Sequence, residues 1–444
     1  MGVFFGVDGL RGKINDDLSR EIAYKCGNAL GGKYPNSKIL IGRDTRGTGD
    51  FVALSFATGA MNAGAGIVDV GVCPTAGISY LTTLLNFDFG VVISASHNYA
   101  EYNGIKIFDK TGRKIGDRIE EELEKLFLKE VVVSYDKVGA YEHNPRLVLH
   151  YEKFLANSIE TSLRGKTIVL DCANGAAYKL APAVFRDNKA KIIATFCKPD
   201  GLNINNRCGA LNISRLQRYV QKYKADMGFA FDGDGDRLIA VDEQGKVVDG
   251  DKLLYLFASY YLEKGCLTGN QVVGTRHTNM GVEKALLEKG VELIRSDIGD
   301  KYVSSKMIEN KVKVGGEQSG HLILADKLPT GDGILNALQV AAICVEQGKR
   351  LSEFFDFEVY QQKNINVEVF DKIRIVNSAR LAKITEEEER LLGGNGRIMI
   401  HVSGTEPCIR VMVETKDALL SAEVAERIAK GIKEINLENL KCVE

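Results

Sequence analysis

The sequence predicts an α/β fold of several domains, with mixed, mostly parallel sheets and a smaller α+β domain at the C-terminal end. The chain has 444 residues, and a single hydrophobic core rarely grows beyond about 250–300 residues, so several domains are expected. Short apolar runs alternate with helical patterns over most of the length, which is typical of layered α/β domains. The C-terminal part instead has three strand-like runs and a final amphipathic helix.

The pattern of apolar residues places each expected element. Strands are expected at residues 37–41, 89–93, 166–170, 225–231 and 271–273, and helices at 118–128 and 253–262. In the C-terminal part, strands are expected at 368–375, 396–402 and 409–413, a charged helix at 385–392 and an amphipathic helix at 421–435.

Four apolar runs end abruptly in a polar loop. We name these the serine loop (94–98), the acidic loop (232–237), the glutamate loop (315–321) and the threonine loop (403–407). Ligands of α/β sheets bind beyond the carboxyl ends of strands, so four such loops predict four domains around one central cleft. The expected domains are residues 1–152, 153–251, 252–365 and 366–444, and each carries one loop in the same order.

Composition excludes several classes of function. The formal net charge is −1, which argues against nonspecific binding of nucleic acid by a basic surface. The nine cysteines include no Cys-x-x-Cys pair, so neither a zinc site nor a disulfide framework is expected. No signal-peptide core and no apolar stretch of about 18 residues is found, so a cytoplasmic location without membrane contact is expected.

The acidic loop, Asp232-Gly233-Asp234-Gly235-Asp236-Arg237, places three carboxylates at alternate positions with glycines between them. Hard oxygen ligands at this spacing suit Mg²⁺ or Ca²⁺. An EF-hand is disfavoured, because its sixth position should be glycine and is Arg237 here. A solvated acidic turn is the other alternative. Arg237 favours the metal site, since a cation beside a metal suits a phosphate ligand.

The serine loop, Ser94-Ala95-Ser96-His97-Asn98, follows a strand. Ser96 is expected to be exposed there and able to act as a nucleophile, although a serine at this place also suits the cap of a helix. A Ser-His-Asp hydrolase is disfavoured, because Gly-x-Ser-x-Gly is absent and the neighbours Ser96 and His97 would not normally form a triad pair. Lys106 is close enough in sequence to reach the site, although a single lysine is more often a surface residue.

The remaining two loops carry groups that suit sugars and phosphates. Glu317, Ser319 and His321 in the glutamate loop together donate and accept hydrogen bonds, as sugar hydroxyls require. Ser403-Gly404-Thr405 in the threonine loop offers hydroxyls and closely spaced backbone N–H groups, a nest suited to phosphate. Arg410 follows closely and could bind the same phosphate in a bidentate manner.

Together the loops resemble those of the α-D-phosphohexomutase family over essentially the whole chain. Residues 5–12, Phe-Gly-Val-Asp-Gly-Leu-Arg-Gly, are similar to the N-terminal motif of the family. Ser96 matches its phosphoserine, and the three aspartates of the acidic loop match its magnesium ligands. The glutamate loop matches its sugar loop, and the threonine loop with Arg410 matches its phosphate loop.

The resemblance implies phosphoryl transfer through a phosphorylated Ser96, with Mg²⁺ and a sugar bisphosphate as priming activator. The implied metal ligands are Ser96, Asp232, Asp234 and Asp236. The implied catalytic residues are Ser96, His97, Lys106, Arg237 and Arg11, among which the group that transfers the proton stays open. The implied substrate-binding residues are Glu317, Ser319, His321, Ser403, Gly404, Thr405 and Arg410. A hexose phosphate substrate and a homodimer are implied as well.

Within the family, the chain resembles the bacterial branch that interconverts glucosamine 6-phosphate and glucosamine 1-phosphate, a step toward UDP-N-acetylglucosamine. The resemblance to this branch lies in Gln318 and in residues 171–176, 199–205 and 410–414. The alternatives are a family member that acts on glucose or mannose phosphates and a non-catalytic sugar-phosphate-binding paralogue.

Three single positions and the segment Arg276-His277-Thr278-Asn279 depart from the pattern of the family. Val7 stands where threonine is usual, Tyr99 where proline is usual and His401 where arginine is usual. An imidazole loses its charge near neutral pH, so phosphate binding beside His401 is expected to be weaker or pH-dependent.

Overall fold

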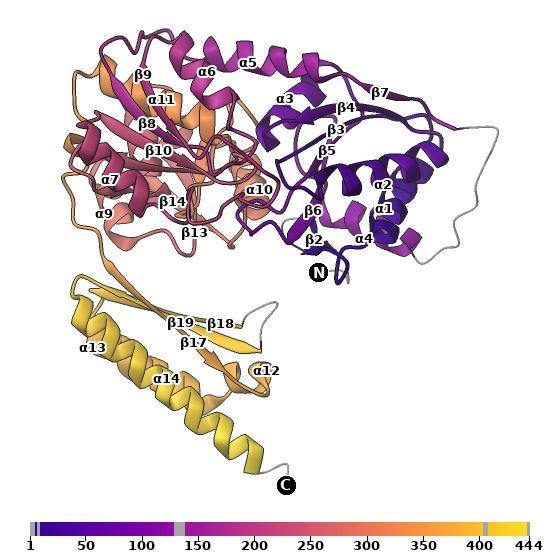
Figure 1. Cartoon of the computed structure of the whole chain (residues 1–444). Helices are drawn as coiled ribbons and strands as arrows, with labels where there is room; N and C mark the ends of the chain where they lie inside the picture. The colour runs from indigo at the N-terminus through magenta and orange to yellow at the C-terminus, as the bar shows by residue number, and fades with distance from the viewer. Residues whose placement is uncertain (1–4, 7–8, 128–137, 403–406, 442–444) are drawn as a thin grey trace. The chain divides into compact units, whose positions relative to one another are not determined.

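The computed structural model describes residues 5–6, 9–127, 138–402 and 407–441, with side chains up to residue 438. The chain divides into two compact units, which are residues 1–278 with 289–355, and residues 279–288 with 356–444. The first unit contains three mixed sheets and the second a three-stranded antiparallel sheet (Figure 1). The predicted α/β fold with a smaller C-terminal α+β domain is therefore confirmed.

The first sheet has seven strands in the order β1-β2-β6-β5-β3-β4-β7. The strands are β1 Phe5–Gly6, β2 Gly9–Lys13, β3 Lys38–Arg43, β4 Gly66–Val72, β5 Phe89–Ile93, β6 Tyr102–Asp109 and β7 Tyr141–His143. The helices of this part are α1 Arg20–Lys33, α2 Gly49–Asn62, α3 Thr75–Leu84 and α4 Asp117–Phe127. Every residue of β5 is buried, which is typical of a parallel strand whose two faces are both covered.

The second and third sheets have the orders β12-β11-β10-β8-β9 and β14-β13-β15-β16. The strands of the second are β8 Thr167–Asp171, β9 Lys191–Thr195, β10 Met227–Phe231, β11 Leu238–Asp242 and β12 Val247–Val248. Those of the third are β13 Gln271–Thr275, β14 Glu292–Ser296, β15 Val314–Gly316 and β16 Leu322–Leu324. The helices are α5 Val148–Ala156, α6 Leu180–Asp187, α7 Ser214–Tyr223, α8 Gly250–Glu263, α10 Asp300–Asn310 and α11 Gly333–Glu346.

The three sheets of the first unit share one topological feature. The serine loop joins β5 to β6, the acidic loop joins β10 to β11, and the glutamate loop joins β15 to β16. In each case a strand with a parallel neighbour is followed by an antiparallel strand. The three polar loops therefore occupy equivalent places, at the edge of the sheet where ligands of α/β proteins bind.

The second unit contains the strands β17 Gln361–Glu368, β18 Gly396–Val402 and β19 Cys408–Thr415. Its helices are α9 Met280–Glu288, α12 Lys372–Val376, α13 Ala379–Leu392 and α14 Ala418–Lys441. The strand predicted at 368–375 is wrong, because β17 ends at Glu368 and the second half of that range, residues 372–375, belongs to helix α12. The side chain of Asp371 accepts a hydrogen bond from Arg374 N at 2.9 Å and so begins this helix.

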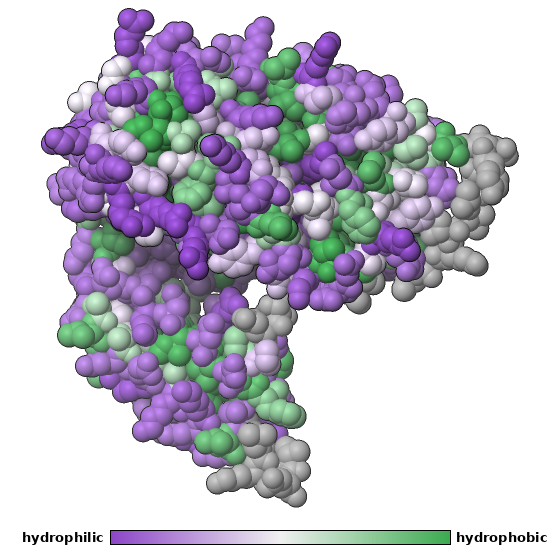
Figure 2. Space-filling view, viewed as in Figure 1, coloured by the Kyte–Doolittle hydropathy of each residue, from purple (hydrophilic) through white to green (hydrophobic). Residues whose placement is uncertain are grey.

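The surface carries apolar side chains in small groups among polar ones on the face shown in Figure 2. In the part of the chain that the structure describes, no helix combines the length and apolar character needed to cross a membrane. The eight cysteines described there are unpaired by disulfides, and most of them are buried.

Candidate active site

The acidic loop forms a buried cluster of carboxylates. Asp232, Asp234 and Asp236 are at most 3% exposed, and one carboxylate oxygen of each lies within 4.8 Å of the others. Burial, followed by repulsion from Asp236 and Asp234, raises the pKa of Asp232 well above its usual value. Because β11 pairs directly with β10 across this loop, the flanks are strands and the loop is no EF-hand.

The residues of this cluster fit a metal ion. Three carboxylates supply the hard oxygen ligands that divalent cations prefer, and a bound cation would offset the repulsion among them. Oδ1 of Asp236 is buried and has no hydrogen-bond partner among the described residues, so it offers a ligand atom. Lys106 partly compensates the charge, with Nζ 2.7 Å from Asp234 Oδ2 and 3.2 Å from Asp236 Oδ2.

Ser96 lies against this cluster. Its hydroxyl donates a hydrogen bond to Asp232 Oδ2 at 2.6 Å, and Nδ1 of His97 lies 3.3 Å from the same hydroxyl. The expectation that Ser96 is exposed is wrong. Only 1% of its surface is exposed, because the acidic loop packs on it. A Cβ atom at Gly233 would lie 2.5 Å from Ser96 O, so this close approach requires glycine.

Two predicted cations, Lys106 and Arg11, lie on neighbouring strands of the first sheet. Lys106 on β6 is 1% exposed, so the alternative of a surface lysine is wrong. The reason is that the Lys106 ammonium forms ion pairs with two aspartates of the acidic loop. Arg11 lies on β2 directly opposite Gly104 of β6, two residues before Lys106. The structure thus brings Lys106 into the site and places Arg11 beside its strand.

The glutamate loop adjoins the acidic loop. Arg237 and His321 form a β-bridge, and the guanidinium Nε of Arg237 lies 3.9 Å from Asp232 Oδ2. His321 is 3% exposed, with Nε2 3.6 Å from Asp300 Oδ2. Ser319 is partly exposed, as expected for a side chain available to a ligand.

Glu317 is partly buried in the glutamate loop. Its Oε1 accepts a hydrogen bond from Gly299 N at 2.9 Å. Burial raises the pKa of Glu317, although His321 acts in the opposite direction. The loops of the three sheets are therefore brought together within the first unit.

The predicted phosphate-binding residues belong to the second unit. Ser403, Gly404 and Thr405 lie outside the described residues, as does Val7. Arg410 is exposed on β19, directly opposite His401 on β18. Cross-strand partners of this kind project to the same face of a sheet, so the unusual imidazole lies beside the predicted phosphate-binding arginine.

Three polar residues near the site were not singled out by the sequence. The hydroxyl of Thr75, at the start of α3, donates to Asp234 Oδ2 at 2.6 Å. Arg46 and Asn205 donate to backbone carbonyls of the serine loop. Arg46 could have been found from its place in Asp44-Thr45-Arg46, just after strand β3. Asn205 is the last residue of the segment 199–205, which resembles the bacterial branch of the family.

Comparison with known proteins decides the family. Models of phosphoglucomutase/phosphomannomutase α/β/α domains I, II and III and of the C-terminal domain match residues 2–132, 149–245, 249–360 and 365–431. The chain belongs to the α-D-phosphohexomutase family. The predicted resemblance is confirmed, and the enzymes of this family are isomerases.

Relatives of similar length support this membership of the phosphohexomutases. The chain is 43% identical to the phosphoglucosamine mutase of Carboxydothermus hydrogenoformans, over 98% of this chain and all of that one. Identity to the phosphoglucosamine mutase of Pelotomaculum thermopropionicum is also 43%, with the same coverage.

Solved phosphohexomutase structures share the fold. A phosphoglucomutase/phosphomannomutase family protein from Burkholderia thailandensis superposes with a TM-score of 0.81 at 22% identity, over 97% of each chain. Aspergillus fumigatus N-acetylphosphoglucosamine mutase, in complex with GlcNAc-6P and magnesium, gives a TM-score of 0.67 at 19% identity, over 97% of this chain and 96% of that one.

Proposed function

We propose that this phosphohexomutase is a phosphoglucosamine mutase, which interconverts glucosamine 6-phosphate and glucosamine 1-phosphate through phosphorylated Ser96. The observation that carries the proposal is the contact of 2.6 Å between the Ser96 hydroxyl and a buried cluster of three aspartates. A hydroxyl placed there would carry its phosphoryl group next to the cluster. The relatives named phosphoglucosamine mutase support the choice of sugar.

The proposed reaction has two transfers at Ser96. In the first, the C1 hydroxyl of glucosamine 6-phosphate attacks the phosphoserine, and the bond between phosphorus and Ser96 Oγ breaks. The sugar becomes a 1,6-bisphosphate and loses the proton of its C1 hydroxyl. The bisphosphate then turns end for end, and Ser96 Oγ bonds to the phosphorus of the 6-phosphoryl group. The bond from that phosphorus to the C6 oxygen breaks, and this oxygen takes up the proton released in the first transfer, which leaves glucosamine 1-phosphate and phosphorylated Ser96. A sugar bisphosphate would phosphorylate Ser96 before the first cycle.

The charges around Ser96 suit this transfer. Asp232, Asp234, Asp236 and a phosphoserine oxygen would hold Mg²⁺, which when bound supplies charge compensation for the transferring group. His97, with Nδ1 3.3 Å from Ser96 Oγ, is within reach of the proton that moves. Lys106 is a second candidate, since its ammonium already lies among the carboxylates. Arg237 and Arg11 stay candidates as well.

The glutamate loop suits a substrate that binds in two orientations. Glu317 and Ser319 are partly exposed in the same loop as His321, which forms a β-bridge with Arg237. They could bind sugar hydroxyls that exchange places when the bisphosphate turns. Arg410, together with Ser403, Gly404 and Thr405, would bind the phosphate that is not transferred.

The test is turnover of glucosamine 6-phosphate by Ser96→Ala, with Mg²⁺ and catalytic glucose 1,6-bisphosphate. The expected result is loss of turnover and loss of the phosphate found on the wild-type chain by intact mass. Ser259→Ala is the matched control, since Ser259 is a buried serine of α8. Turnover of Ser96→Ala at the wild-type rate would refute the proposed nucleophile.

The choice of sugar needs a separate measurement. Wild-type kcat/KM is compared for glucosamine, glucose and mannose 6-phosphates under one set of conditions. The expected order places glucosamine 6-phosphate first. A higher value for glucose or mannose would leave the phosphoserine mechanism intact and overturn the substrate.

A further inference from the structure

A buried arginine lies beneath the serine loop. Arg46 follows β3, and its side chain is 0% exposed. The guanidinium group has five N–H donors, and all five are used. Nε donates to Asp44 Oδ2 at 2.9 Å. The others donate to backbone carbonyls of one segment, namely to Ser96 O at 2.9 Å, Asn98 O at 2.9 Å, Tyr102 O at 3.0 Å and Tyr99 O.

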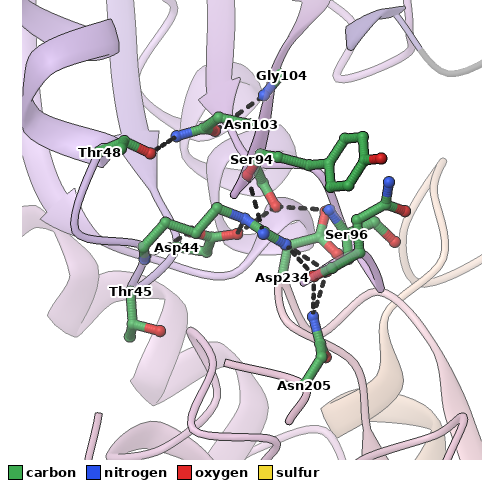
Figure 3. A network of polar contacts seen from close by, with 12 residues as sticks. Asp44, Thr45, Thr48, Ser94, Ser96, Asn103, Gly104, Asn205 and Asp234 are labelled. Atoms are coloured by element: carbon green, nitrogen blue, oxygen red, sulfur yellow. Dashed lines mark hydrogen bonds and ion pairs between the residues drawn. The ribbon is translucent and has the colours of Figure 1, made fainter. Parts of the chain in front are cut away.

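A second planar donor reaches the same segment from another domain. Asn205 precedes α7, and its Nδ2 donates to Ser96 O at 2.8 Å and to Asn98 O at 2.9 Å. Figure 3 shows Asn205 approaching Ser96 from the side opposite Ser94. The two carbonyls that flank His97 are therefore each bound by both Arg46 and Asn205. Sequence separations of 50 residues for Arg46 and 109 for Asn205 make these contacts purely tertiary.

The amide of Ser96 is tied to the same arginine through two side chains. Ser96 N donates to Ser94 Oγ at 2.9 Å, and Ser94 Oγ donates to Asp44 Oδ2 at 2.5 Å. Asp44 is itself the ion-pair partner of Arg46. The N–H and the C=O of Ser96 are thus both fixed by one buried ion pair (Figure 3).

This network holds Ser96 in a backbone conformation that is costly for serine. Its φ is 51°, in the left-handed region, which is unfavourable for a residue with a Cβ atom. In this conformation the hydroxyl is directed at Asp232. Such strain persists only where surrounding contacts hold the backbone firmly. Here Arg46 and Asn205 donate six hydrogen bonds to four carbonyls, and Ser94 connects the Ser96 amide to Asp44.

We propose that Arg46 and Asn205 are positioning residues, which hold the Ser96 hydroxyl and the phosphate it carries in the orientation required for transfer. The inference rests on the proposed function of Ser96. Neither residue touches the transferring group, and both act on it through the backbone of the serine loop. Tyr99, which departs from the family, takes part through its carbonyl, so the substitution leaves this contact available.

Lysine cannot replace Arg46 in this role. A single ammonium offers three donors from one point, whereas the guanidinium spans four carbonyls in a fixed plane. Without the planar guanidinium group and its hydrogen bonds to these carbonyls, Ser96 can leave its left-handed conformation. A displacement of about 1 Å at a reacting atom can cost about 100-fold in rate, so the effect is expected on transfer rather than on sugar binding.

The main experiment compares Arg46→Lys with Arg43→Lys. Arg43 ends β3, is 16% exposed in its side chain and pairs with Asp50 and Asp69 rather than with the serine loop. Both proteins are first phosphorylated with glucose 1,6-bisphosphate. Loss of phosphate from Ser96 to glucosamine 6-phosphate is then followed in a single turnover by intact mass, beside steady-state KM and the melting temperature.

The expected result is a rate of transfer at least about tenfold lower in Arg46→Lys, with KM within about twofold of the wild type. Arg43→Lys should transfer at the wild-type rate. Equal transfer rates for the two variants, or a change in KM alone, would overturn the inference. Wild-type protein that takes no phosphate on Ser96 would instead overturn the proposed function.

Asn205 provides a second variant in case Arg46→Lys folds poorly. Asn205→Gly removes the amide, and glycine adopts the φ of 57° found there without strain. Asn206→Gly is the control, since Asn206 is exposed. Asn205→Gly should slow transfer and Asn206→Gly should not, whereas equal rates would exclude a positioning role for Asn205. Because both residues bind the same carbonyls, the effects of Asn205→Gly and Arg46→Lys should be non-additive in the double variant.

Discussion

The serine loop and the glutamate loop occupy equivalent places in their sheets but are held by different means. Side chains hold the serine loop, and Ser96 is buried with its hydroxyl bound to Asp232. Backbone contacts hold the glutamate loop, in which Gly250 N donates to Gln318 O and Leu238 N donates to Gly320 O. The side chains of Glu317 and Ser319 remain partly exposed.

The difference matches two tasks in the proposed reaction. Phosphoryl transfer needs a nucleophile in one fixed position, so the serine loop is fixed down to the φ angle of Ser96. A bisphosphate that turns over needs groups that accept two orientations of a sugar. The glutamate loop is held by backbone hydrogen bonds and by the contact from Gly299 N to Glu317, while Glu317 and Ser319 stay partly exposed. Changes on the serine side should therefore act on transfer, and changes on the glutamate side on sugar binding.

The largest effect is expected from Asp236→Asn. This variant changes the aspartate cluster that lies against the serine loop. The change removes one of three clustered carboxylates, and loss of one electrostatic group at a transition state costs roughly 3–4 kcal/mol, or about 10²–10³ in kcat. The Mg²⁺-dependent rise in melting temperature should disappear as well. Asp242→Asn, at the other end of β11, is the buried control. Retention of both turnover and the Mg²⁺ response would contradict the assignment of the metal site.

An effect of similar size, but on stability rather than on turnover, is expected from Lys106→Met. The variant leaves Asp234 and Asp236 buried without the ammonium that now lies between them, and breaking a buried ion pair costs about 3–5 kcal/mol. The loss should be greatest in EDTA and partly reversed by Mg²⁺, so the Mg²⁺-induced shift in melting temperature should exceed that of the wild type. Lys33→Met removes a more exposed ion pair with Glu122 and should cost at most about 1 kcal/mol.

A change on the sugar side, Glu317→Gln, sharpens the comparison. The amide keeps the hydrogen bond from Gly299 N but loses the charge, and a hydrogen bond to a charged group contributes about 1.5–3 kcal/mol. We expect kcat/KM for glucosamine 6-phosphate to fall about tenfold or more, with an unchanged Mg²⁺ shift in melting temperature. Glu309→Gln, on the surface of α10, should change neither. Loss of the Mg²⁺ response in Glu317→Gln would show that the two loops do not act separately.

The pH dependence of the same variant is also predicted. Because burial raises the pKa of Glu317, its carboxylate is protonated at a higher pH than an ordinary glutamate. The KM of the wild type should therefore rise relative to that of Glu317→Gln as the pH is lowered toward that raised pKa, so the ratio of the two KM values isolates the contribution of Glu317.

The smallest effect concerns Asp332, which begins helix α11 beside the acidic loop and the glutamate loop. Gly331 packs on the His321 ring, and Gly333 N donates to Gly235 O at 3.0 Å. Burial raises the pKa of Asp332 to about 6, although hydrogen bonds from Leu335 N and the Tyr151 hydroxyl oppose this rise.

The folded chain therefore binds a proton at Asp332 more tightly than the unfolded chain does, and stability gained from this proton is lost as the pH rises through about 6. Between pH 7 and 5.5 the wild type should gain on the order of 1 kcal/mol relative to Asp332→Asn. The melting temperatures of both proteins, measured across this range, check the prediction. Asp371→Asn, an exposed cap in the second unit, should show no such dependence, and a constant difference for Asp332→Asn would contradict it.

Much of the architecture follows from local sequence. Runs of β-forming residues that end in polar loops predicted β5 and β18 with their observed bounds, because a buried strand and a polar turn differ sharply in composition. The same logic failed at 368–375. There the alternation of apolar residues suggested a strand, but Asp371 caps the start of helix α12 instead.

The chemical groups of the site could be predicted from the sequence. Three alternating aspartates, a serine after a strand and the glutamate loop each carry their chemistry in consecutive residues, and their order along the chain indicated the family. The contacts that hold these groups in place became visible only in the folded chain. In the fold, Lys106 is a buried counter-charge to the aspartates, and Arg46 and Asn205 support Ser96. These roles could not be predicted, because hydrogen bonds between residues 50 to 136 positions apart leave no periodic pattern in the sequence. Arginine and asparagine are residue types that usually lie on the surface. The role of Arg46 and Asn205 follows from their burial against the strained serine loop.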